Sequence, residues 1–201
     1  MVIGIPDNFH FILASRSPRR QQLLKELGLD FDIVTIDYEE DYPPNLSGAD
    51  IAEYLAHQKA DQFKDRITDN DIVITADTIV WCNNKVLDKP SDHKEAFNIL
   101  RTISGQTHEV ITGVTFLSNL SEFTFSETTR VTFDHLSDEE INFYIKEFKP
   151  FDKAGAYGIQ EWIGLVGIIS IEGSYFNVMG LPVQKLFIEL KKYIRNINKL
   201  K

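Results

Sequence analysis

Short apolar runs alternate with amphipathic segments along nearly the whole chain, and this alternation limits the folds open to it. Residues 9–14 and 72–81 are apolar enough for buried strands, whereas residues 50–63 carry apolar side chains at helical spacing. A capping box at residues 137–140 marks the start of another helix, and the glycine-rich last quarter contains strand-like runs. Strands interleaved with helices indicate an α/β or α+β fold.

The length favours a single domain. A chain of 201 residues can form one sizeable core, or one domain folded as two lobes around a cleft. Its composition, 43% hydrophobic and 25% charged, is that of an ordinary globular protein, and the chain has neither an internal repeat nor a long linker. We therefore expect one two-lobed domain over residues 1–201.

Charge and apolar patterning narrow the class of partner. The formal net charge is −9, whereas proteins that grip nucleic acid need a broad positive potential. No basic run precedes the apolar stretch within residues 1–14, and the run at residues 163–171 is too short to span a bilayer. The single cysteine, Cys82, excludes an internal disulfide. We expect a cytoplasmic protein that binds neither nucleic acid nor membrane and whose polyanionic ligand is small.

Two arginines stand where a helix is expected to begin. Ser17 is a good N-cap, Pro18 suits the first helical position, and Arg19 and Arg20 follow in the first turn. Positive charge near a helix N-terminus costs about 0.3–1 kcal/mol per residue, and a bound phosphate would remove that cost. The pattern therefore predicts a phosphate site, although two solvated arginines on a surface helix are the alternative.

A carboxylate interrupts the most apolar strand. Asp77 lies in the middle of residues 72–81, and a buried carboxylate needs a partner, a metal or access to water. It is either a metal ligand or general base in a cleft, or a structural group bonded to nearby backbone.

The strand that carries Asp77 is expected to continue into a hairpin. A two-residue turn at 83–84 would pair Cys82 with Lys85, and the same register sets Lys89 opposite Thr78. Side chains alternate between faces, so Lys89 falls on the face opposite to the strand carboxylate. The hairpin brings the two charges close without letting them touch in an ideal ladder.

Three further segments offer polar groups. Lys59 falls inside the apolar arc of its helix, where a lysine either snorkels to solvent or points toward a cleft. The acidic run at residues 39–41 is either solvated or a source of oxygen ligands for Mg²⁺. In residues 152–160 two glycines permit close backbone approach to a strand or a ligand, and the Gln160 amide suits reading the edge of a base.

Common templates are missing from the sequence. It has no G-x-x-x-x-G-K-[ST] loop, no G-x-G-x-x-G fingerprint, and neither H-E-x-x-H nor G-x-S-x-G. Taken in order, however, seven segments resemble the Maf family of nucleoside triphosphate pyrophosphatases, also called septum-formation inhibitors. The segments are LASRSPRRQQLL at 13–24, QKA at 58–60, ADTIV at 76–80, DKP at 88–90, SGQTHEVITGV at 104–114, DKAGAYGIQ at 152–160 and MGLPV at 179–183.

The resemblance implies a fold and an activity. Members of that family have a mixed α/β, ITPase-like fold, in which helices flank a central mixed twisted sheet and two lobes surround a cleft. They need Mg²⁺ or Mn²⁺, are often dimeric, and cut a nucleoside triphosphate into a monophosphate and pyrophosphate. The resemblance thus implies a divalent metal cofactor, a nucleoside triphosphate substrate and a homodimer for this chain.

Residue roles carry over by motif. The resemblance implies that Asp77 is the general base and a metal ligand, with Glu40 as the second ligand. The resemblance also implies that Arg19, Thr78 and Gln160 determine specificity, and these residues resemble those of the subgroup acting on dTTP and UTP rather than those of the subgroup acting on 7-methyl-GTP. The implied substrate-binding residues are Ser15, Ser17, Arg19, Arg20, Lys59 and Lys89.

Two departures from the family pattern stand out. Glu161 and Trp162 occupy positions where small residues are common, and about seven extra residues precede the first motif. We expect the first departure to bear on the base pocket. The alternatives are the same chemistry on 7-methyl-GTP or another nucleotide, and a non-catalytic nucleotide-binding regulator of cell division.

Overall fold

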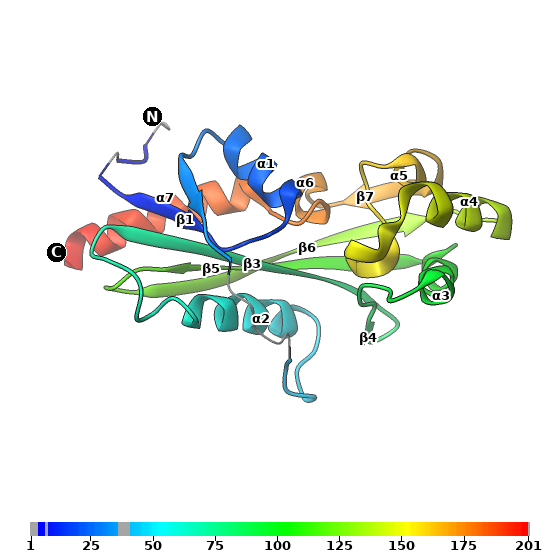
Figure 1. Ribbon diagram of the computed structural model, residues 1–201, viewed down its shortest axis with the longest axis horizontal. Coiled ribbons are helices and arrows are strands. Elements are labelled where there is room, and N and C mark those ends of the chain that lie inside the picture. The colour runs from blue at the N-terminus through cyan, green and yellow to red at the C-terminus, as the bar shows by residue number, and fades with distance from the viewer. Residues whose placement is uncertain (1–3, 7, 36–40, 201) are drawn as a thin grey trace. The chain divides into compact units, whose positions relative to one another are not determined.

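The computed structural model describes residues 4–6, 8–35 and 41–200, and they form two compact units. Unit 1 comprises residues 1–77, 112–127 and 180–201, and unit 2 comprises residues 78–111 and 128–179. Three long strands, which are drawn in Figure 1, contribute residues to both units. These strands are β3 (Asp71–Cys82), β5 (Thr107–Leu117) and β6 (Glu122–Phe133).

The strands form one seven-stranded mixed sheet in the order β2-β1-β3-β5-β6-β7, with β4 paired to β3. Strand β1 runs parallel to both β2 and β3, whereas β4 is antiparallel to β3 and β7 is antiparallel to β6. The expected mixed α/β fold with a central mixed sheet is confirmed. The single two-lobed domain stays a prediction.

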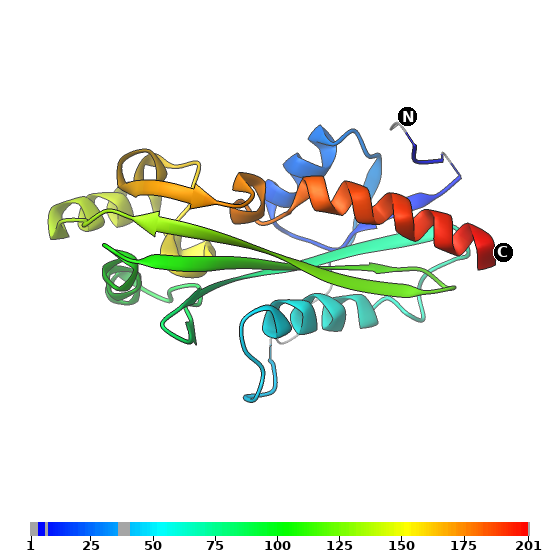
Figure 2. The same ribbon diagram turned by 180° about the vertical axis from the view of Figure 1, so that it is seen from behind.

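Unit 1 consists of strands with helices on both faces, and one of these helices packs closely against a strand. Its helices cover both faces of the strands, with α2 on one side and α1 and α7 on the other (Figures 1 and 2). Gly113 of β5 lets α2 approach, because a Cβ there would lie 2.1 Å from the carbonyl oxygen of Ala52. Thr75 of β3 donates a 2.6 Å hydrogen bond to the carbonyl of Ala56. Its remaining elements are β1 (His10–Leu13), β2 (Phe31–Ile33), α1 (Pro18–Glu26), α2 (Ala49–Asp61) and α7 (Val183–Leu200).

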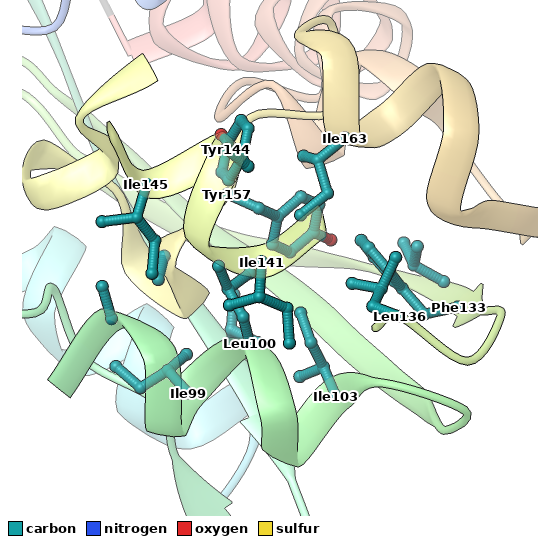
Figure 3. Packing of buried hydrophobic residues seen from close by; sticks show 14 of the residues in the cluster. Ile99, Leu100, Ile103, Phe133, Leu136, Ile141, Tyr144, Ile145, Tyr157 and Ile163 are labelled. Carbon is teal, nitrogen blue, oxygen red and sulfur yellow. The ribbon is translucent and has the colours of Figure 1, made fainter. Parts of the chain in front are cut away.

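Unit 2 packs helices around its own hydrophobic cluster. Figure 3 shows Ile141 of α4 facing Leu100 and Ile103 of α3, and all three side chains are almost completely buried. Tyr144 and Tyr157 extend the same cluster. The elements of the unit are β4 (Lys85–Val86), α3 (His93–Ile103), α4 (Asp138–Phe148), α5 (Trp162–Gly167), β7 (Ile168–Glu172) and α6 (Tyr175–Val178), with 3-10 turns η1 (Pro150–Asp152) and η2 (Ala154–Ala156).

Several local expectations are confirmed. Cys82 pairs with Lys85, and the turn at residues 83–84 has positive φ at both positions, as a two-residue hairpin turn requires. Ser17 caps α1 by accepting from the Arg20 N–H, and the capping box at the start of α4 is present. Within the described residues, no helix has the length and apolarity to cross a bilayer.

Another expectation is wrong in detail. The glycine-rich last quarter, expected to contain strand-like runs, is helical at Trp162–Gly167 and extended only at Ile168–Glu172, and the Gly164 N–H bonds to the Glu161 carbonyl at the start of α5. Apolar content alone does not separate a short strand from a short helix. Asp92 caps α3, because its side chain accepts from the Glu95 N–H.

Candidate functional site

The amino terminus of α1 is ordered by its own serines. Ser15 is buried, and its hydroxyl accepts from the Ser17 N–H at 3.2 Å. The Ser17 hydroxyl accepts from the Arg20 N–H at 3.4 Å, and Pro18 has no N–H to offer. Several backbone donors of the first turn are therefore accounted for within the protein. An anion here would depend mainly on the guanidinium groups, and Arg19 is half-buried in this turn.

Arg20 is held by backbone carbonyls far away in sequence. Its Nε donates to the Gly180 carbonyl at 2.7 Å, and an Nη donates to the Ala76 carbonyl at 2.8 Å. Ala76 directly precedes Asp77 on β3, so one side chain connects the start of α1, the middle of β3 and the glycine of the MGLPV motif. The arginine fork suits two such acceptors.

Asp77 and Lys59 meet in unit 1. Asp77 is 7% exposed in the middle of β3, and its carboxylate Oδ1 is ion-paired with the ammonium of Lys59 on α2. The Lys59 side chain is 14% exposed, so its charge is largely withdrawn from water. The structure thus selects the inward orientation of Lys59 over the snorkelling alternative. A buried ion pair of this kind orients a carboxylate more than it stabilises a fold.

Unit 2 contains the predicted specificity residues Thr78 and Gln160 and also Lys89, which is predicted to bind phosphate. Thr78 is half-buried on β3, whereas Lys89 and Gln160 are exposed. The arm that ends in Lys89 is tied to the segment before Gln160, because the Gly155 N–H bonds to the Leu87 carbonyl at 2.9 Å. Gly155 has a φ of +68°, and a Cβ there would lie 2.7 Å from Val80. That contact and conformation explain the glycine in terms of packing.

Of the two carboxylates predicted to hold a divalent metal, Asp77 has the chemistry that such a site needs. Asp77 supplies a carboxylate oxygen, the ligand that Mg²⁺ prefers when it also binds substrate phosphates. Glu40 lies outside the described residues.

A second group of ligand atoms is present in unit 1. One ligand atom each of His57, Asp61 and Glu122 lies within 4.8 Å of the others. The Lys64 ammonium, however, lies 2.6 Å from Asp61 Oδ1 and 3.2 Å from Glu122 Oε2. A cation would have to displace this lysine, so the group is already satisfied as an ion-pair network.

The sequence reasoning gave no role to Lys153 or Tyr144, and it singled out Glu161 only as a departure from the family pattern that bears on the base pocket. Lys153 and Glu161 form a buried ion pair in unit 2, and Tyr144 bonds to the same carboxylate. The signal for Lys153 was its place in the DKAG motif at residues 152–155, where it carried no predicted role, whereas Tyr144 and Glu161 lie outside that motif. Gly180 was also quoted only as part of a motif, although its carbonyl anchors Arg20.

The comparisons with known proteins place the chain in a family. Residues 10–193 match the model of the family described as Maf-like protein, so the chain belongs to that family. A protein of Bacteroides thetaiotaomicron named dTTP/UTP pyrophosphatase is 47% identical over 192 residues, covering 95% of this chain and all of the relative. One of Flavobacterium johnsoniae with the same name is 50% identical over 179 residues, covering 89% of this chain and 92% of the relative.

Solved structures offer only a distant likeness. The Ham1 protein of Staphylococcus aureus aligns with a TM-score of 0.42 and 11% identity, over 62% of this chain and 71% of that one. At that level the likeness has no bearing on the site.

Proposed function

We propose that this chain is a nucleotide pyrophosphatase that hydrolyses dTTP and UTP to the monophosphate and pyrophosphate. The observation that carries the proposal is the 47–50% identity, over nearly the full length of both chains, to proteins named for that activity. The Lys59–Asp77 pair supports it by offering a buried, oriented carboxylate on the central strand. The net charge of −9 supports a small polyanionic ligand, and we place the enzyme in the cytoplasm.

In this proposal Asp77 is the general base. Lys59 holds Oδ1, and Oδ2 accepts a proton from a water molecule. The water oxygen forms a bond to the α-phosphorus, the bond from that phosphorus to the bridging oxygen breaks, and its electron pair leaves with pyrophosphate. A divalent cation bound by Asp77 and Glu40 would polarise the phosphates and neutralise part of their charge.

Cationic side chains take up the charge that develops on pyrophosphate. Arg19 in the first turn of α1, Lys59 and Lys89 are assigned this role, with Ser15 and Ser17 shaping the loop. Arg20 contributes its charge from a position held by the Ala76 and Gly180 carbonyls. Arg19, Thr78 and Gln160 are assigned to selection of the pyrimidine base.

The product identifies the activity. Incubation with dTTP or UTP and Mg²⁺ is expected to release one pyrophosphate per monophosphate. Release of orthophosphate would move the cut to another bond, and binding without turnover would favour a nucleotide-binding regulator. A kcat/KM for 7-methyl-GTP above that for dTTP would replace the proposed substrate.

We also propose that two copies associate through the end strand of the sheet. Strand β7 is last in the strand order, and Leu165, Val166 and Ile169 on and beside it are 81%, 48% and 64% exposed. An apolar edge strand is a site for pairing with another chain. Sedimentation is expected to show a dimer for the unmodified protein and a monomer for Ile169→Lys. A dimer that survives this substitution would place the interface elsewhere.

A further inference from the structure

Gln160 is carried by a turn whose two ends are both anchored. The Glu161 N–H bonds to the Gly158 carbonyl at 3.0 Å and closes a four-residue turn with Ile159 and Gln160 at its centre. Ile159 is buried and Gln160 is exposed, so the turn anchors itself on one side chain and presents the other. The conformation at Gln160 therefore depends on what fixes Gly158 and Glu161.

One hydroxyl group fixes both of these residues. The Tyr144 oxygen accepts from the Gly158 N–H at 3.0 Å and donates to the Glu161 carboxylate. Tyr144 is fully buried on α4, within the cluster drawn in Figure 3. Burial, and then the bond to Glu161, raise the pKa of Tyr144, so its hydroxyl remains a proton donor over the working pH range.

The second oxygen of Glu161 is held by a buried lysine. The Lys153 ammonium lies 3.2 Å from Glu161 Oε1 and 2.7 Å from Asp152 Oδ1, and Lys153 is only 8% exposed. A buried charge needs such partners, so the carboxylate and the ammonium hold each other in place. Both oxygens of Glu161 thus have a defined donor.

Local backbone features fit this arrangement. A Cβ on Gly158 would lie 2.8 Å from the carboxyl carbon of Glu161, so a side chain at this position would displace the carboxylate from its place over the turn. Ala156 has a φ of +56°, a conformation that is costly for a non-glycine residue and persists only where surrounding contacts impose it. Both features agree with a segment whose backbone is constrained by its surroundings.

We propose that Glu161, Tyr144 and Lys153 are positioning residues that fix the Gln160 amide and thereby set selectivity for the pyrimidine base. The inference rests on the proposed function, in which Gln160 contacts the base. An amide discriminates only if its donor and acceptor are held in place, because a mobile one adapts to several bases. The chemistry at phosphorus is assigned to other residues, so loss of the network should change the choice of base more than the rate of cleavage.

The test compares Tyr144→Phe and Glu161→Gln with Tyr193→Phe. Tyr193 is a matched control, since it is a buried tyrosine in unit 1 whose hydroxyl bonds to Ser118 at 2.9 Å. Steady-state kinetics with dTTP and GTP give the ratio of the two kcat/KM values. Tyr144→Phe and Glu161→Gln are expected to lower that ratio about tenfold, mainly through KM for dTTP. Tyr193→Phe is expected to lower Tm by a similar amount and to leave the ratio unchanged.

A double-mutant cycle separates positioning from general stability. In a Gln160→Ala background, Tyr144→Phe should change the dTTP:GTP ratio by less than about twofold, because the group through which it acts is gone. Equal loss of kcat/KM for both nucleotides in Tyr144→Phe, or a full additive effect in the Gln160→Ala background, would overturn the inference.

A binding measurement distinguishes failure of the inference from failure of the proposed function. Calorimetry with α,β-imido-dTTP and α,β-imido-GTP gives the ratio of the two Kd values without cleavage. If the unmodified protein releases no pyrophosphate, the proposed activity fails, but a shift of this Kd ratio in Glu161→Gln still supports positioning. An unchanged Kd ratio in both unit 2 variants overturns it.

Discussion

Each unit contains an ion pair between a carboxylate and a lysine whose side chain is largely shielded from water, and the two pairs are built differently. In unit 1, Lys59 pairs with Asp77 across α2 and β3. In unit 2, Lys153 pairs with Glu161, and the pair recruits Tyr144 and Asp152 as well. The lysine side chains are similarly withdrawn from water, at 14% and 9% exposure.

The difference lies in how each carboxylate is satisfied. Both oxygens of Glu161 have donors from side chains packed around a turn, which suits a group that maintains a conformation. Asp77 has one oxygen bound to a lysine in the middle of a strand, which suits a group that must still accept a proton. Burial and charge alone therefore do not separate the proposed general base from the proposed positioning carboxylate.

The largest expected effect separates two aspartates of the same strand. Asp77→Asn should lower kcat about 1,000-fold, because the amide cannot accept the proton of the attacking water. Asp71→Asn is the control, since Asp71 is equally buried on β3 but bonds to His10 and to Thr68. It should lower Tm and leave kcat within about twofold. Near-normal turnover in Asp77→Asn would remove the general-base role.

Substitution of either lysine should lower the free energy of unfolding by a similar amount, but the two substitutions should affect kcat differently. Lys59→Met removes the lysine partner of the buried Asp77 carboxylate, and Lys153→Met removes that of the half-buried Glu161 carboxylate. Each substitution is expected to cost about 3 kcal/mol of unfolding free energy and to lower Tm by about 9 °C. Only Lys59→Met is expected to reduce kcat more than about tenfold, because only Lys59 touches the proposed base. Calorimetric scans and kinetics on both variants measure this. Equal losses of kcat would abolish the distinction between the pairs.

A buried histidine should make unit 2 sensitive to acid. Burial lowers the pKa of His108 to about 4, and its Nε2 lies 2.8 Å from the Tyr157 hydroxyl. In the folded state His108 therefore stays neutral at pH values where the same side chain in the unfolded chain, with an ordinary pKa near 6.5, is protonated. The contribution of His108 to the free energy of unfolding is therefore complete above about pH 6.5 and is lost as the pH falls toward 4.

Between pH 6.5 and 5 the unmodified protein should lose about 2 kcal/mol more unfolding free energy than His108→Gln does. Urea titrations at the two pH values test this. Parallel pH profiles for the two proteins would contradict it.

The smallest expected effect has the opposite sign and belongs to unit 1. Hydrogen bonds, first to Asp71 and then to Asp32, raise the pKa of His10. The stabilisation is present below pH 6.5 and disappears as the pH rises through the raised pKa. Because the His10 side chain is 52% exposed, His10→Gln should lower Tm by only about 1–2 °C at pH 6 and by nothing at pH 9. Equal losses at both pH values would point to packing instead.

The sequence by itself determined the features that depend on near neighbours. The Ser17 cap, the capping box of α4 and the pairing of Cys82 with Lys85 could all be predicted, because each is formed by groups within a few residues of one another. The ordered motifs also sufficed for the family, which the match over residues 10–193 confirms.

Only the tertiary structure decided which charged groups meet. The sequence does not indicate that Lys59 forms an ion pair with Asp77, or that Lys153 forms one with Glu161. Nor does it indicate that Arg20 bonds to the Gly180 carbonyl. Partners so distant depend on strand order and on helix packing, such as the approach of α2 that Gly113 permits. A charged side chain withdrawn from water must be satisfied within its own packed surroundings, and those surroundings exist only once the chain has folded.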